Sequence, residues 1–216
     1  MTETGESRRR AVVHPAEVVA VVGGAALLTS SWVVVALERR VPGWEARVFH
    51  DLNNVTGTWW SVVRWPMQLG SLPGSLVVVV VVYAVSSNLR LAGAALAASQ
   101  AAYWGAKAVK DLVARARPGA LLTGVHVREH VSGLGYLSGH TAVAFALATV
   151  IAPSVPRAWR PVLFAAAGLV AFARIYGGAH LPLDTVGGAG LGLLCGTLAR
   201  WAFGLGGEGV RPRHAA

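Results

Sequence analysis

Six long apolar runs constrain the fold of this chain more than any other feature. They cover residues 16–38, 70–87, 89–108, 138–155, 159–176 and 183–203. A bilayer core about 30 Å thick needs roughly 20 apolar residues per helix, and each run approaches that length. Lipid admits only helices or closed barrels, and the period-two alternation of a barrel is absent from the sequence. We therefore predict an all-α integral membrane bundle of six transmembrane helices.

The composition agrees with a membrane domain. Of the 216 residues, 54% are hydrophobic and 13% are charged, whereas a soluble domain is about one-quarter charged. The 26 glycines suit close helix packing. Segment 39–69 is too polar to span and is rich in tryptophan, so we expect an interfacial segment between the first two helices. We expect a membrane domain over 16–203, flanked by cytoplasmic tails at 1–15 and 204–216.

The charge pattern indicates the partners. The net charge is +9, but the basic residues are scattered among the apolar runs and form no stripe. This pattern argues against nucleic acid and for anionic lipid and phosphate. The single cysteine, Cys195, excludes a disulfide framework within the chain and a Cys-rich metal site. We expect no cofactor and no catalytic metal, and the sequence does not indicate an oligomeric state.

Two polar clusters flank the loop between the third and fourth runs. Ionisable groups near the ends of apolar spans are costly and are candidates for function. Lys110 and Arg117 form the first cluster, and both side-chain types bind phosphate. Ser138, Gly139 and His140 form the second cluster at a predicted helix start, where free N–H groups attract anions. A juxtamembrane basic patch, an N-cap serine and a structural histidine are the alternative interpretations.

A third cluster bridges the last two runs on the same predicted side of the membrane. It contains Arg174, His180 and Asp184. Pro182 suits the first turn of a helix, which places Asp184 in that same turn. From there the carboxylate can accept a hydrogen bond from His180, fixing its tautomer and leaving the other ring nitrogen free to attack. A structural His–Asp contact that caps a helix is the alternative.

Taken together, the three clusters resemble the three-part signature of the type 2 phosphatidic acid phosphatase (PAP2) superfamily, in its bacterial membrane-bound lipid phosphatase branch. The matching residues are Lys110, six residues, Arg117-Pro118; Ser138-Gly139-His140; and Arg174, five residues, His180, three residues, Asp184. Two positions depart from the family pattern. Leu137 stands where the family usually has Pro, and Ala173 stands where it usually has Ser.

The resemblance implies a role for each matching residue. His180 would be the nucleophile that forms a phosphohistidine, with Asp184 as its orienting partner. His140 would be the general acid that protonates the leaving oxygen and then the base that activates water. The groups implied to hold the phosphoryl oxygens are the side chains of Lys110, Arg117, Ser138 and Arg174 and the backbone N–H of Gly139. Such cations can take the place of metal ions in phosphoryl transfer.

The expected function is a metal-independent hydrolase of lipid phosphates, with a polyprenyl (undecaprenyl-type) diphosphate slightly favoured as substrate. Phosphatidylglycerophosphate and phosphatidic acid are the alternative substrates, and phosphotransfer to a lipid or sugar is the alternative reaction. Phospholipid binding or transport is the non-enzymatic alternative, although the sequence lacks the repeats common in transporters. The expected location is the bacterial inner membrane. The distribution of basic residues outside the binding clusters weakly favours cytoplasmic termini and an extracytoplasmic site.

Overall fold

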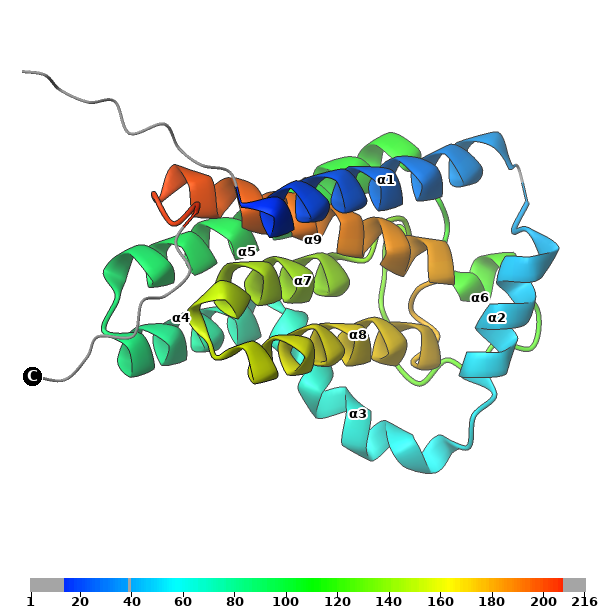
Figure 1. Ribbon diagram of the computed structural model, residues 1–216. Helices are drawn as coiled ribbons and strands as arrows, with labels where there is room; N and C mark the ends of the chain where they lie inside the picture. Colours follow the sequence, from blue (N-terminus) through cyan, green and yellow to red (C-terminus); the bar gives the residue numbers. More distant parts are fainter. Residues whose placement is uncertain (1–13, 39, 208–216) are drawn as a thin grey trace, which may run out of the picture.

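The computed structural model describes residues 14–38 and 40–207, and every regular element in these ranges is a helix (Figure 1). The elements are α1 (Pro15–Leu37), α2 (Gly43–Asn53), η1 (Gly57–Trp59), α3 (Trp60–Met67), η2 (Gln68–Gly70), α4 (Leu72–Ser86), α5 (Leu89–Val113), α6 (Pro118–Leu121), α7 (Gly139–Ile151), η3 (Ala152–Ser154), η4 (Arg157–Trp159), α8 (Arg160–Tyr176) and α9 (Pro182–Ala202). The tails predicted at 1–15 and 204–216 lie largely outside the described residues.

The long helices pack side by side around α7 (Figure 1). Helix α7 contacts α5, α8 and α9, while α1 covers the outer side of α9 and α4 lies against α5. Most of the side chains of α7 and of the first turns of α9 are buried, so these two helices form the centre of the bundle. Figure 1 shows α2 and α6 at one end of the bundle, beside the turn that joins α8 to α9.

Close approach between α7 and α9 depends on glycine. Gly188, Gly192 and Gly196 are four residues apart and therefore lie on one face of α9. A Cβ atom added at Gly192 would lie 2.4 Å from the carbonyl oxygen of Ala142, and one at Gly188 would lie 2.5 Å from that of Ser138. The two backbones thus meet at a distance that a larger residue would prevent, which is the packing that the glycine content suits.

A helix occupies each of the six segments predicted to span the membrane. By length and hydropathy, two helical stretches among the described residues can cross a bilayer, Pro15–Leu37 and Arg157–Tyr176. The stretch 57–70 and helix α4, bent by 71°, would add a third if they form one span. Helices α4 and α7 are too short to cross a bilayer by this measure. The hydropathy of α5 and α9 is lowered by Ala, Gly and charged residues. The arrangement of six spans stays a prediction.

The segment between the first two long helices folds into α2, η1, α3 and η2. Helix α2 exposes Trp44 but buries Glu45 and Phe49 completely. Met67 and Val63 of α3 pack against Tyr176 of α8. This segment therefore closes the end of the bundle at which the polar clusters gather.

Candidate active site

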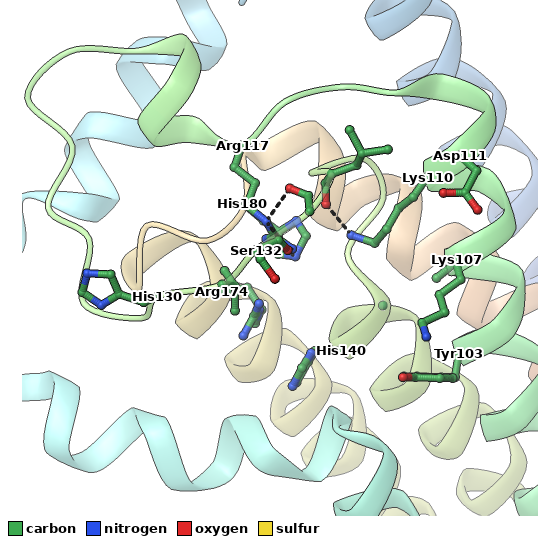
Figure 2. Close-up of a pocket in the computed structure, with 15 residues that line it drawn as sticks. Tyr103, Lys107, Lys110, Asp111, Arg117, His130, Ser132, His140, Arg174 and His180 are labelled. Carbon is green, nitrogen blue, oxygen red and sulfur yellow. Dashed lines mark hydrogen bonds between the residues drawn. The ribbon is translucent and has the colours of Figure 1, made fainter.

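A cavity of about 760 Å³ opens between α5, α7, α8 and the long loop that follows α6. Six of the eight residues predicted for the site line it: Lys110, Arg117, Gly139, His140, Arg174 and His180. The other two, Ser138 and Asp184, are fully buried behind its wall. Figure 2 shows His180 beside Arg117, with Arg174 and His140 below them and Lys110 on the α5 side. The three sequence clusters therefore meet at one place.

His180 lies in the short turn between α8 and α9. Gly178 has a φ of 76°, a conformation that L side chains rarely adopt, and this lets the chain reverse after α8. The His180 backbone N–H then donates to the carbonyl oxygen of Arg174 at 3.2 Å. The imidazole is almost fully buried, and its Nε2 atom lies 3.5 Å from Arg117 Nη1. Because Arg174 and His180 are joined in this way, both reach the same cavity.

The electrostatic surroundings of His180 favour its neutral form. Burial lowers its pKa well below the usual range, and the positive charges of Arg174, Lys110 and Arg117 lower it further. On the other side, Nδ1 lies 3.5 Å from Asp184 Oδ2. A neutral imidazole with one nitrogen facing a carboxylate retains a lone pair on the other nitrogen.

Asp184 stands in the first turn of α9, and Pro182 is the first residue of that helix, as the sequence predicted. The Leu181 N–H donates to Asp184 Oδ2 at 2.9 Å, so the carboxylate closes the first turn. Its other oxygen, Oδ1, accepts from Arg115 Nη1 at 2.8 Å. One oxygen therefore faces His180 and the other is held by a guanidinium group that no sequence motif had singled out.

His140 and Gly139 open helix α7. Ser138 is the N-cap of this helix, and its hydroxyl oxygen accepts hydrogen bonds from the Thr141 backbone N–H and from the Thr141 hydroxyl. The side chain of Ser138 thus has the capping role that the sequence allowed as an alternative, and a contact from it to phosphate stays a prediction. His140 sits in the same first turn and lines the cavity.

The three cationic side chains reach the cavity from different elements. Lys110 Nζ donates to the carbonyl oxygens of Leu134 and Gly135 at 2.9 and 3.2 Å. Arg117 Nη1 donates to the carbonyl oxygen of Ala179 at 2.8 Å. Arg174 pairs with Glu129, a loop carboxylate outside the three sequence clusters. No group of three or more His, Cys, Asp or Glu side chains with the geometry of a metal site occurs in residues 14–38 and 40–207.

The loop before α7 is held by hydrogen bonds from Asn53 and Arg128, which no sequence motif predicted. Asn53 of α2 donates to the carbonyl oxygens of His126 and Tyr176, each at 3.0 Å. Arg128 donates to the carbonyl oxygens of Asn53 and Tyr176, each at 2.8 Å, and its guanidinium group stacks over the Tyr176 ring. Arg128 therefore braces the loop, whereas His130 lines the cavity.

Comparisons with known proteins identify the family and the fold of this chain. The family model of the PAP2 superfamily matches residues 88–205, which hold all three clusters. No curated protein sequence matches the chain. Among solved structures, LpxE from Aquifex aeolicus is 25% identical with a TM-score of 0.66, covering 71% of this chain and 93% of that one. A transmembrane PAP2 type phosphatidylglycerolphosphate phosphatase from Bacillus subtilis is 20% identical with a TM-score of 0.68, covering 83% and 95%.

Proposed function

The chain belongs to the PAP2 superfamily, and on this premise we propose that it is an integral-membrane lipid phosphatase that works through a phosphohistidine on His180. The observation that carries the proposal is that His140 and His180 line one cavity together with Lys110, Arg117 and Arg174. Binding alone requires cations, whereas a second imidazole and a histidine 3.5 Å from a carboxylate suit catalysis.

In the first step, the lone pair on His180 Nε2 attacks phosphorus. Asp184 supports the imidazole from the Nδ1 side, at 3.5 Å. The new N–P bond forms as the bond from the terminal phosphorus to the leaving oxygen breaks, and this oxygen is the bridging oxygen of a diphosphate or the ester oxygen of a monoester. His140, which carries a proton once the phosphate is bound, gives that proton to the leaving oxygen. The products of this step are a phosphohistidine and the leaving lipid, which is a polyprenyl monophosphate when the substrate is the diphosphate and a lipid alcohol when it is a phosphomonoester.

In the second step, water attacks the phosphohistidine. His140, now neutral, removes a proton from the water, and the electron pair of the N–P bond returns to Nε2 of His180. Lys110, Arg117 and Arg174 stabilise the charge that spreads over the phosphoryl oxygens in both steps. We propose that these three cations do the work of metal ions, with the backbone N–H of Gly139 as a further donor and with Ser138 fixing the helix start.

A polyprenyl diphosphate is the substrate that we favour. The Bacillus subtilis protein is a phosphatidylglycerolphosphate phosphatase, so this lipid is the first alternative, and phosphatidic acid is the next. A cavity of about 760 Å³ admits a phosphorylated head group, while the hydrophobic tail would stay in the bilayer. Transfer of the phosphoryl group to a second lipid or to a sugar uses the same first step.

The test is phosphate release from these three lipids in detergent, with a chelator present. We expect His180→Ala and His140→Ala each to lose at least about 10³-fold in kcat. His126→Ala is the matched control, because the side chain of His126 is exposed and only its backbone makes the contacts that brace the loop. Full activity of His180→Ala would refute the nucleophile, and loss of activity with chelator would refute the metal-free step. Label that appears in a second lipid or a sugar would indicate transfer.

A further inference from the structure

Arg115 lies between two carboxylates from distant parts of the chain. Its Nη1 atom donates to Asp184 Oδ1 at 2.8 Å. Its Nη1 and Nη2 atoms donate to the two carboxylate oxygens of Glu45, at 3.2 and 2.6 Å. Glu45 belongs to α2 and Asp184 to α9, so one guanidinium group joins the segment that closes the bundle to the carboxylate beside His180.

All three charges are withdrawn from water. The side chains of Glu45 and Asp184 are 0% exposed and that of Arg115 is 9% exposed. Glu45 also accepts from the Leu183 backbone N–H at 2.9 Å, beside the first turn of α9. Burial lowers the pKa of Arg115, but its contacts with Glu45 and Asp184 outweigh burial and raise the pKa above its ordinary value. Arg115 is therefore charged in the folded protein and lies against two carboxylates.

The net charge of Arg115, Glu45 and Asp184 affects how well a positive charge on the His180 imidazole is stabilised. Arg115 alone would neutralise Asp184, and a neutralised carboxylate gives little support to an imidazole that becomes positive or phosphorylated. Glu45 adds a second negative charge, so the three side chains carry a net charge of about −1. The position of Arg115 on Oδ1 leaves Oδ2 toward His180 Nδ1.

We infer that Arg115 and Glu45 are positioning residues for the reaction, with Arg115 fixing the orientation of Asp184 and Glu45 offsetting the charge of Arg115. This inference rests on the proposed function. It extends the site beyond the family signature to α2, a helix that precedes the matched segment 88–205.

Several other charged or titratable groups face His180. Arg174 reaches it from α8, Lys110 from α5, His140 from α7, and Arg117 from the segment after α5. Glu129 is paired with Arg174. Asp184 is the carboxylate in contact with the ring, so a change in how Asp184 is neutralised acts directly on His180.

The test compares Glu45→Gln, Arg115→Gln and the double variant. Glu45→Gln removes a negative charge, and we expect the apparent pKa of His180 to fall. Arg115→Gln removes a positive charge, and we expect the apparent pKa of His180 to rise. In the double variant both changes cancel, and the pKa should return toward the wild-type value. The pKa is measured by NMR of protein with labelled histidine rings, with His180→Gln as the assignment control.

The kinetic readout is the pH dependence of lipid phosphate hydrolysis by the same variants. We expect each single variant to lose about 10- to 100-fold in kcat, and the double variant to recover part of the loss. Asp51→Asn on the exposed side of α2 is the matched control and should behave as wild type.

The NMR titration and the kinetic assay test the inference and the proposed function independently of each other. Shifts of equal sign in the two single variants, no shift in either, or a double variant worse than both singles would overturn the inference. If one single variant does not fold, the sign of the shift in the other still decides. A wild-type protein that releases no phosphate would refute the proposed function, while the NMR titration would still report whether Arg115 and Glu45 act on His180.

Discussion

Lys110 and Arg117 are tied to the backbone of the cavity wall. Lys110 Nζ donates to the carbonyl oxygen of Leu134 at 2.9 Å, and Arg117 donates to those of Ser132 and Ala179 at 3.0 and 2.8 Å. These bonds hold two positive charges at fixed points, so little reorganisation is needed when a phosphoryl group meets them. The carbonyl oxygens do not neutralise either charge.

Arg117→Lys keeps the positive charge but replaces the planar guanidinium group, with its fixed set of N–H donors, by a single ammonium group. Lysine cannot bond the carbonyl oxygens of Ser132 and Ala179 and also reach the cavity, because its three donors share one nitrogen. With one or two charge-assisted hydrogen bonds lost, we expect kcat/KM to fall about 10- to 100-fold. Steady-state hydrolysis in detergent measures the change. Arg64→Lys, on the exposed side of α3, is the control, and equal activity in both variants would contradict the role of the planar guanidinium group.

The pH profile tests the neutral state of His180. Burial and the positive charges of Arg174, Lys110 and Arg117 lower its pKa well below 6.5. A lowered pKa keeps the nucleophile neutral in mildly acidic solution, so protonation of His180 should reduce kcat/KM only well below pH 6.5. The acid limb of kcat/KM reports the free enzyme. Arg174→Met removes one of these positive charges and should move the acid limb to higher pH. An acid limb centred at or above pH 6.5 in the wild type would contradict this assignment.

Helices α7 and α9 position different groups of the candidate site. Helix α7 presents His140 at its start, and the start of α9 holds Asp184 behind His180. The backbone N–H of Ser138 donates to the carbonyl oxygen of Asp184 at 2.8 Å, which ties the two helix starts together. Glycines on α9 let the helices run in contact from that point onward. Their contact thus sets the spacing of the two histidines.

Gly192→Ala tests this contact. A Cβ atom at this position would lie 2.4 Å from the carbonyl oxygen of Ala142 and 2.7 Å from the Cβ of Phe145, so α9 would have to move. We expect a loss of about 1–3 kcal/mol in stability, measured as thermal unfolding in detergent. Gly23→Ala on α1 is the control, because nothing lies within 4 Å of its added Cβ. Equal stability of the two variants would show that the helices are not in tight contact at Gly192.

The apolar runs of the sequence predicted where the long helices lie. The spacing of polar residues predicted which side chains belong to the candidate site. His180 and Asp184 are four residues apart, so local geometry brings them together in almost any helix start. Arg115 and Glu45 are 70 residues apart, and no spacing links them. Glu129 meets Arg174 across 45 residues in the same way. Long-range ion pairs depend on the packing of the whole bundle, and one sequence gives no signal for them.

The candidate site lies toward one end of the helical bundle. Helices α2 and α6 and the turn after α8 lie at one end (Figure 1). His180 of that turn lines the cavity. The turn between α7 and α8 lies at the other end of those helices and carries Arg157 and Arg160. Basic residues at membrane surfaces favour the cytoplasmic side. Because Lys110, Arg117 and Arg174 serve the candidate site, we leave them out of the charge comparison and predict that the site faces outward and both termini face the cytoplasm.

Cysteine labelling tests that orientation. With Cys195 replaced by Ser, single cysteines are placed at Val127, in the exposed loop beside the site, and at Ala158, in the exposed turn at the opposite end. We expect a membrane-impermeant maleimide to label Val127→Cys in intact spheroplasts and Ala158→Cys only after permeabilisation. The reverse pattern would place the site on the cytoplasmic side. Because the two positions lie at opposite ends of α7 and α8, labelling of both from one side would contradict a membrane-crossing arrangement of those helices.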